Sequence, residues 1–171
     1  MKGVRLQSHP VNYRGMRVRA LIVALVGAAV LVPAAQAEKL TFAVTSVSLS
    51  AKTTDKLPKG TSKGDTIVYR DRLINAAKQL GRAKGAVVGS DRGTMTFTSA
   101  HTATFSGTAV LPGGTLTLSG KVVALPDKTI AIPVTGGTGR YAKARGYVLV
   151  GPGQAKALNT YTLTLPGAPV A

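Results

Sequence analysis

The sequence predicts an all-β domain, either a closed barrel or a sandwich, and three observations lead to this prediction. Apolar residues recur at every second position in short segments, as Met95 and Phe97 do between threonines. Clusters of glycine, proline and polar residues separate these segments. Almost no stretch spaces its apolar residues as an amphipathic helix would. Short alternating strands in a chain of this length are typical of barrels and sandwiches.

Residues 1–37 have the pattern of an export signal. Five basic residues flank the start of a short apolar run at residues 20–31, and Ala35-Gln36-Ala37 forms an A-x-A cleavage site. The apolar run is shorter than a comfortable membrane span. We therefore predict a signal peptide over residues 1–37, one β-barrel domain over residues 38–171, and a secreted, extracellular protein. Met1 and Met16 both remain as possible starts.

The predicted mature chain is strongly basic. Seventeen Lys and Arg residues and six Asp and Glu residues follow residue 37, which gives a net charge of +11. This charge favours anionic neighbours such as a cell-surface polymer, although the spread of the basic residues also fits a simple solvated surface. No nucleic-acid-binding motif is present, so we expect no nucleic-acid partner. The chain contains no cysteine, which excludes disulfides and thiol chemistry.

Eight or nine strands are expected, at residues 40–49, 67–73, 82–88, 94–98, 103–109, 116–118, 129–134, 144–150 and 158–165. In the first strand the alternation resumes out of phase at Val47, which predicts a bulge near residues 45–46. Residues 58–64 form a loop, and residues 75–80 fit a single helical turn. Residues 112–114, Pro-Gly-Gly, predict a hairpin turn.

The segment VTGGTGRYAKARGYVLV contains a GxGxxA match, which is found in dinucleotide-binding loops. That interpretation requires a following helix, a βαβ crossover and an acid about 20 residues later. Here β-forming residues follow within one or two turns, and Asp127 is the last acid in the chain. We therefore interpret Gly136, Gly137 and Gly139 as turn glycines that allow positive φ.

Residues 136–147, GGTGRYAKARGY, resemble the GGTG-x-aromatic-x-x-ARG segment of plant dirigent proteins and a similar segment of allene oxide cyclases. Residues 64–73, GDTIVYRDRL, resemble the G-D-x-V-x-F-x-D/N-x-L strand of this superfamily. GRAKG at residues 81–85 and the hairpin TLTLSGKV also match in order. The resemblance spans residues 40–165. It implies an eight-stranded antiparallel barrel with a lipocalin-like apolar pocket; members of the family often form homotrimers.

The resemblance also indicates which residues to examine. Allene oxide cyclase activity is not expected, because the first strand lacks the Glu of that site and Val87 stands at its Cys position. Plant dirigent proteins use acids and an arginine around the pocket to handle quinone-methide intermediates, and Asp71 and Arg145 fall on matching positions. Arg140 stands where plant coupling proteins often carry an acid.

Asp71 is the first candidate for chemistry, because alternation places it on the expected core face. A carboxylate there has a raised pKa and can serve as a general acid or base; alternatively, it turns outward or forms a structural pair with Arg72 or Arg145. Arg145 fits either an anion site in the pocket or an ion pair at the rim. Tentative ligand-binding residues are Tyr69, Tyr147, Phe42 and Phe105.

The remaining polar residues fit structural roles. Tyr141 is expected to plug the barrel end, Asp65 to cap a turn, and His101 to lie in a surface turn. His101 is the only histidine after residue 37, so we expect neither a metal site nor a cofactor.

Two functions remain open. The first is an exported barrel that binds a small hydrophobic or phenolic ligand in its cavity. The second is a dirigent- or cyclase-like protein that steers cyclisation or coupling of a reactive intermediate with Asp71 and Arg145. A purely structural protein that uses its charge on cell-wall polymers is a third interpretation.

Overall fold

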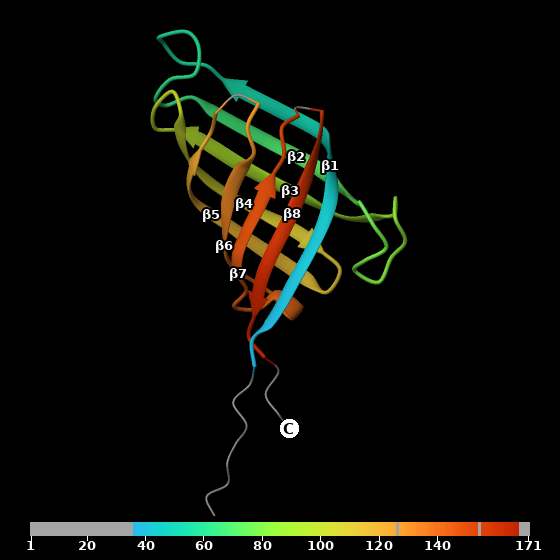
Figure 1. Cartoon of the computed structure of the whole chain (residues 1–171). Coiled ribbons are helices and arrows are strands. Elements are labelled where there is room, and N and C mark those ends of the chain that lie inside the picture. Colours follow the sequence, from blue (N-terminus) through green and yellow to red (C-terminus); the bar gives the residue numbers. More distant parts are fainter. Residues whose placement is uncertain (1–35, 126, 154, 168–171) are drawn as a thin grey trace, which may run out of the picture. The chain divides into compact units, whose positions relative to one another are not determined.

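Eight antiparallel strands close into a barrel in the computed structural model, which describes residues 36–125, 127–153 and 155–167 (Figure 1). Each strand pairs with the next along the chain, and β8 pairs with β1 to close the ring. The predicted eight-stranded barrel is therefore confirmed, whereas residues 1–35 of the predicted signal peptide lie outside the described residues. The strands are β1 (Glu38–Thr54), β2 (Thr66–Asn75), β3 (Val87–Phe97), β4 (Thr102–Leu111), β5 (Gly114–Val123), β6 (Ile130–Gly137), β7 (Arg145–Val150) and β8 (Lys156–Leu165).

The alternation seen in the sequence sets which side chains face the interior. In β4, Ala103, Phe105 and Ala109 are buried, whereas the threonines between them lie on the outer face. β4 turns into β5 at Pro112-Gly113, where Leu111 pairs with Gly114 and Gly113 has a φ of +93°. The predicted hairpin turn is therefore confirmed.

The bulge in β1 lies later than predicted. Ser46 and Ser48 continue the inward series of β1, and the register shifts between Ser48 and Ser50. The extra residue, Leu49, is 50% exposed. The prediction of a bulge near residues 45–46 was wrong because it assumed that the apolar Val47 and Leu49 must face the interior, which instead receives the serines.

The segment between β2 and β3 contains no helical turn, contrary to the prediction for residues 75–80. It is a loop closed by an isolated bridge between Gln79 and Arg82. The side-chain amide of Asn75 donates hydrogen bonds to the carbonyl oxygens of Gln79 (2.7 Å) and Arg82 (3.1 Å). These bonds replace the backbone bonds that a helix would have formed. Arg82 pairs with Gln79 inside this loop, so β3 begins at Val87 rather than at residue 82.

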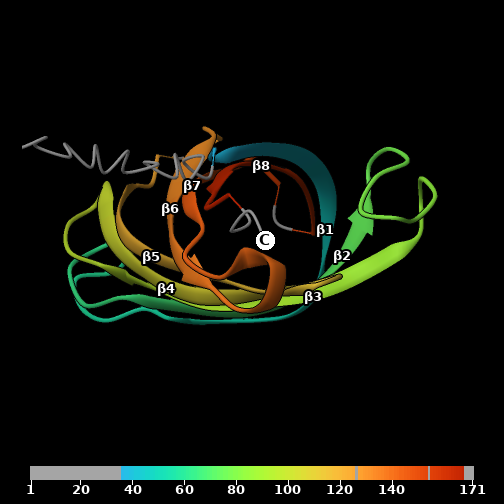
Figure 2. The ribbon, with the colours of Figure 1, turned by 90° about the horizontal axis from the view of Figure 1, so that it is seen from below.

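One end of the barrel is closed by a short 3₁₀ helix, η1 (Gly139–Tyr141), which lies across the opening (Figure 2). Tyr141 is completely buried, and its hydroxyl donates a hydrogen bond to the carbonyl oxygen of Pro112 (3.1 Å). The predicted plug is confirmed. Because β7 follows η1 within four residues, no helix or crossover follows the GxGxxA match, as expected.

The three glycines of this segment serve different needs. Gly139 has a φ of +58°, as predicted, and a Cβ there would lie 2.2 Å from the Gly113 carbonyl oxygen. Gly136 and Gly137 belong to β6 and do not have positive φ, so that part of the prediction was wrong. Gly137 is instead required by close approach, since a Cβ would lie 2.3 Å from the Thr115 carbonyl oxygen.

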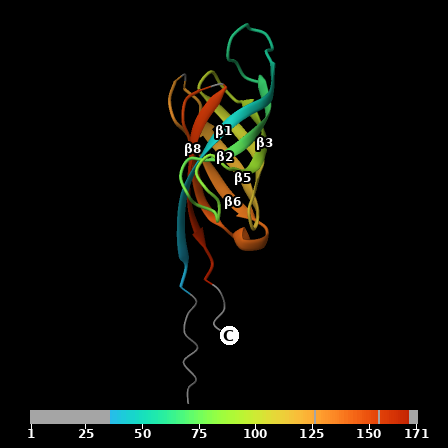
Figure 3. The same ribbon diagram turned by 90° about the vertical axis from the view of Figure 1, so that its right-hand side faces the viewer.

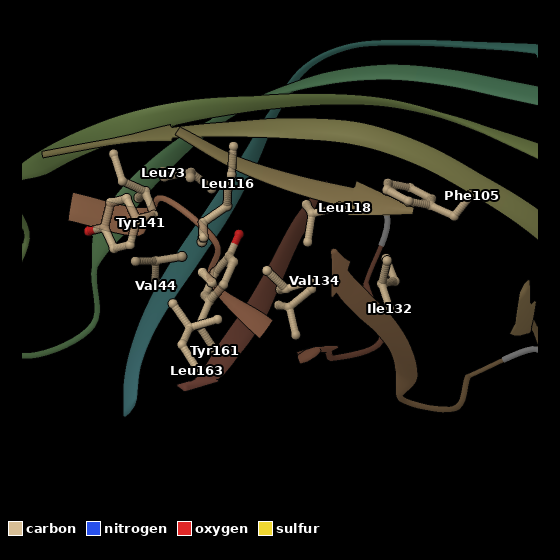
Figure 4. Packing of buried hydrophobic residues seen from close by; sticks show 14 of the residues in the cluster. Val44, Leu73, Phe105, Leu116, Leu118, Ile132, Val134, Tyr141, Tyr161 and Leu163 are labelled. Atoms are coloured by element: carbon tan, nitrogen blue, oxygen red, sulfur yellow. The ribbon is translucent and has the colours of Figure 1, made fainter. Parts of the chain in front are cut away.

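The apolar core fills the half of the barrel next to η1. Figure 4 shows Tyr141, Leu73 and Val44 together at this end, with Phe105 and Ile132 at the other end of the same cluster. Phe42 and Tyr161 stack with ring centroids 4.7 Å apart. Within the described residues, no helix has the length and apolar character needed to cross a membrane.

Candidate functional site

A cavity of about 330 Å³ occupies the half of the barrel farther from η1. It exists because several inward positions there carry small side chains, among them Ser46, Ser48 and Ala51 of β1 and Ala157 of β8. The other lining residues are mostly apolar: Ile67 and Met95 lie on β2 and β3, and Phe105, Ile132 and Val150 lie on β4, β6 and β7. The polar lining residues of the neighbouring strands β8, β1, β2 and β3 form what we call the polar wall, and the apolar lining residues form the apolar wall.

Two aspartates face each other on the polar wall. Asp71 of β2 and Asp91 of β3 are direct cross-strand partners, and both line the cavity. Directly opposed residues place their Cβ atoms about 4.5–5.5 Å apart. Asp91 is only 4% exposed. In the part of the chain that the structure describes, no ion pair links either acid to a lysine or arginine.

The surroundings of the two acids favour their protonated forms. Burial, reinforced by the negative charge of Asp71, raises the pKa of Asp91 to about 7. Burial also raises the pKa of Asp71, and a hydrogen bond from Ser48, its cross-strand partner in β1, partly offsets this effect. The pair therefore holds a proton near neutral pH, and each acid influences the titration of the other.

Further polar groups extend this wall. Asn159 of β8 is 3% exposed and lines the cavity, and within the described residues its Oδ1 atom and that of Asp91 have no hydrogen-bond partner. The ring of Tyr69 packs against Phe105 with centroids 6.1 Å apart. Burial and the nearby acids raise the pKa values of Tyr69 and Tyr161, so both hydroxyls stay protonated. The wall thus combines carboxyl, amide and phenol groups.

Three predicted site residues line the cavity, and a fourth lies beside it. Asp71 faces inward on the same side of β2 as Tyr69, and Phe105 lies on the apolar wall. Phe42 is buried but belongs to the core next to the cavity, where it stacks on Tyr161 instead of lining the space. The binding and catalytic roles assigned to these residues remain predictions.

The other two predicted residues lie on the outer face. Arg145 and Tyr147 are exposed, because the pleat of β7 directs Val148 into the barrel. The guanidinium of Arg145 donates hydrogen bonds to the carbonyl oxygens of Thr135 and Ala144. The predicted pocket pair between Arg145 and Asp71 is therefore wrong. The sequence placed Arg145 on one face with Tyr147 correctly, but that face is the solvent side.

Sequence reasoning missed Asp91 and Asn159. Asp91 precedes Met95 by four positions on the same alternating face, so extending that strand toward its start would have found it. The boundary expected after residue 88 interrupted the series. Asn159 lies on the same alternating face of β8 as Tyr161 and Leu163, so extending that series by one position would have found it too.

Other polar residues lie away from the cavity. The Asp65 carboxylate accepts hydrogen bonds from the backbone N–H groups of Lys56 (2.8 Å) and Ser62 (2.7 Å), which confirms the predicted turn cap and lowers its pKa. Arg140 forms an ion pair with Glu38 (3.1 Å). His101 is exposed in the turn between β3 and β4, as predicted. Among the described residues, no three His, Cys, Asp or Glu side chains are grouped to hold a metal ion.

Comparisons with known proteins agree with this architecture. The family model described as Dirigent-like protein matches residues 35–165. A solved pyocyanin demethylase is 22% identical, with a TM-score of 0.63, and the match covers 73% of this chain and 100% of that one. A pterocarpan synthase dirigent protein is 17% identical, with a TM-score of 0.56 and coverages of 77% and 90%.

A Diels–Alderase from Streptomyces koyangensis is also similar. It is 22% identical, with a TM-score of 0.59, and the match covers 77% of this chain and 65% of that one. At these identities the neighbours establish the fold. No protein with a curated description matches the chain.

Proposed function

The chain belongs to the dirigent-like protein family, and we propose that its barrel binds a small hydrophobic or phenolic molecule in the cavity. The observation that carries the proposal is the division of the cavity into an apolar wall and a polar wall that holds Asp71 and Asp91. Its volume of about 330 Å³ lies within the roughly 300–1,000 Å³ range of small-molecule sites. A ligand with a flat apolar body and one hydroxyl group satisfies both walls.

The polar wall favours a hydroxyl over a carboxylate on the ligand. A phenol O–H can donate to an ionised aspartate, and its oxygen can accept from a protonated one. An anionic ligand would instead bring a further negative charge beside two acids whose own ionisation is already disfavoured. The unpartnered Oδ1 atoms of Asp91 and Asn159 offer further acceptors.

Fluorescence titration with 2-naphthol tests this proposal, with naphthalene and 2-naphthoate as the comparison ligands. We expect 2-naphthol to bind more tightly than either, because only it matches both walls without adding a negative charge. The variant Ile132→Asn changes the apolar wall and should weaken 2-naphthol and naphthalene alike. Tighter binding of the carboxylate, or no binding of any of the three, would contradict the proposal.

The opposed aspartates favour a second candidate, in which the cavity steers cyclisation of a bound intermediate. A protonated Asp91 can stabilise negative charge that develops on a carbonyl oxygen, while an ionised Asp71 accepts the proton of a nucleophilic hydroxyl. The cavity walls hold the reacting groups together and impose one face of attack. In this candidate function, Asp91 has the role beside Asp71 that the sequence analysis had assigned to Arg145.

Ring closure of 2′-hydroxychalcone is a suitable probe of this second candidate. The phenol oxygen adds to the alkene carbon, the phenol proton passes to Asp71, and the α-carbon receives a proton from the acid pair, so that the pair regains its starting proton count. The product is chiral, so an enantiomeric excess reports guidance even when the rate gain is small. We expect Asp71→Asn and Asp91→Asn to lower the excess by at least about tenfold. If 2′-hydroxychalcone binds to the wild-type protein but closes to a racemic product, this second candidate is excluded and the binding proposal is unaffected.

A further inference from the structure

A row of hydrogen-bond donors crosses the outer face of the barrel from β1 to β5. The registers align Ser50 with Arg70, Arg70 with Arg92, Arg92 with Thr108, and Thr108 with Thr117. Arg70 and Arg92 are exposed and stand directly opposite each other on adjacent strands. Figure 3 shows β1, β2 and β3 side by side in this wall. We call this set of five residues the outer donor row.

The central pair of the row is unfavourable by itself. Like charges that lie directly opposite on neighbouring strands repel each other. Exposed Arg72 and Lys52 add two more positive charges next to the row, on β2 and β1. The β-barrel does not need arginine at these outward positions, where neighbouring strands carry threonine and serine. An anion bound between the two guanidinium groups would convert the repulsion into attraction on both sides.

Among the described residues, no acid forms an ion pair with the arginines of this face. Asp71 and Asp91 occupy the same two strands but point into the cavity. Glu38 pairs with Arg140, and Asp65 accepts backbone hydrogen bonds in its turn. The outward positions of β1 to β4 carry no Asp or Glu. The row therefore presents donors without a competing carboxylate among its members.

The surface around the two arginines is hollowed on both sides. One shallow depression is lined by Ser50, Lys52, Val68, Arg70 and Arg92. A second is lined by Arg70, Ser90, Asp91, Arg92, Thr108 and Val110, where Asp91 is only 4% exposed because its side chain lines the cavity inside. Arg70 and Arg92 form the boundary between the two, so an anion seated at this boundary can accept hydrogen bonds from both guanidinium forks and from hydroxyl groups beside them.

We propose that Arg70 and Arg92, at the centre of the outer donor row, bind a phosphate group on the outer surface of the barrel. A tetrahedral phosphate presents several acceptor oxygens, and the planar guanidinium fork matches a pair of them. The site is separate from the cavity, because the alternation of β2 and β3 places the arginines outside and the aspartates inside. It also gives the expected anionic surface partner a defined place to bind.

Thermal unfolding in phosphate and in chloride at equal ionic strength tests the proposal. We expect phosphate to raise the Tm of the wild-type protein by about 3 °C more than chloride does, since binding to the native state shifts unfolding. In the double variant Arg70→Gln, Arg92→Gln this difference should vanish, while the Tm in chloride should not fall because the repulsion is relieved.

The matched control is Lys84→Gln, Lys121→Gln, which removes two positive charges from other exposed positions. It should keep the full phosphate difference. Arg92→Lys keeps the positive charge but loses the planar guanidinium group, and it should reduce the difference in Tm between phosphate and chloride. The proposal is overturned if the wild type shows no phosphate difference, if both double variants lose it equally, or if Arg92→Lys leaves it unchanged.

Sedimentation with vesicles then identifies the source of the phosphate. Pelleting with phosphatidylglycerol vesicles but not with phosphatidylcholine vesicles, reversed by inorganic phosphate, assigns the site to a lipid headgroup. A retained phosphate difference without pelleting assigns it to a soluble or polymeric phosphate. Either result supports the site when Arg70→Gln, Arg92→Gln abolishes it.

Discussion

The two ends of the barrel use the same strands but have opposite interiors. Next to η1, the inward positions are large and apolar, and Tyr141 seals the end. At the other end, the same strands direct serines, alanines, two aspartates and an asparagine into a cavity. In β1 the inward series changes from Phe42 and Val44 to Ser46 and Ser48 within a single strand.

This difference separates two determinants of the fold. Alternation alone decides which side chains face inward, and it holds along both halves of the strands. The size and polarity of those side chains then decide whether the enclosed space becomes core or site. The closed half provides most of the buried apolar area, so the open half can tolerate unpartnered polar groups that would be costly in a smaller core.

The largest expected effect is at the closed end. Tyr141→Ala removes a completely buried ring and should lower the free energy of unfolding by about 3–5 kcal/mol. Tyr69→Ala removes a half-buried ring from the cavity and should cost only about 1–2 kcal/mol, because that ring already borders open space. Urea unfolding of both variants measures the contrast. Equal losses would mean that the two ends do not differ in their contribution to stability.

Asp91→Asn should have the next largest effect, and its sign depends on pH. Below the ordinary aspartate pKa of 3.8 the acid is protonated in both the native and the unfolded states. Between that value and about 7 only the native state keeps the proton, so wild-type stability falls as pH rises, by up to about 1.4 kcal/mol per unit.

The variant lacks this loss and should be more stable than the wild type at pH 8 by about 2–4 kcal/mol. At pH 4 the two should be nearly equal. Urea unfolding at both pH values measures the difference. Parallel pH profiles for the two proteins would show that Asp91 is not a buried acid with a raised pKa.

Asn159→Leu replaces a polar side chain of the cavity with a large apolar one, like those that fill the closed end. In the described part of the chain its amide oxygen is buried without a partner, so an apolar replacement should raise stability by about 1–2 kcal/mol. The same change should weaken 2-naphthol binding by filling the cavity, and a fluorescence titration checks this. Lower stability with unchanged binding would place the asparagine in the core and not in the site.

Arg145→Met should have the smallest effect. Since Arg145 is exposed on the outer face, the change should alter stability by no more than about 0.5 kcal/mol. Its effect should add to that of Asp71→Ala in the double variant, because the two residues do not meet. A coupling energy larger than about 0.5 kcal/mol in this double-mutant cycle, measured by urea unfolding, would instead support the ion pair between Asp71 and Arg145 that the sequence suggested.

The sequence alone predicted the architecture because period-2 alternation is a local property of each strand. The plug at Tyr141, the cap at Asp65 and the inward Asp71 followed from the same local patterns. What the sequence could not supply was the pairing between strands. The opposition of Asp71 and Asp91 is a matter of register, and the inner face of β7 depends on neighbours distant in the chain. Arg145 was misplaced for this reason.

The bulge at Leu49 joins two halves of β1 that are out of phase. Even-numbered residues face inward before it, as Ser46 and Ser48 do, and odd-numbered ones after it, as Ala51 and Thr53 do. Loss of Leu49 would leave a regular strand that points the same residues inward. An insertion or deletion between residues 42 and 48 would exchange the two faces. This strand therefore has one position at which its length can change without altering the contents of the cavity.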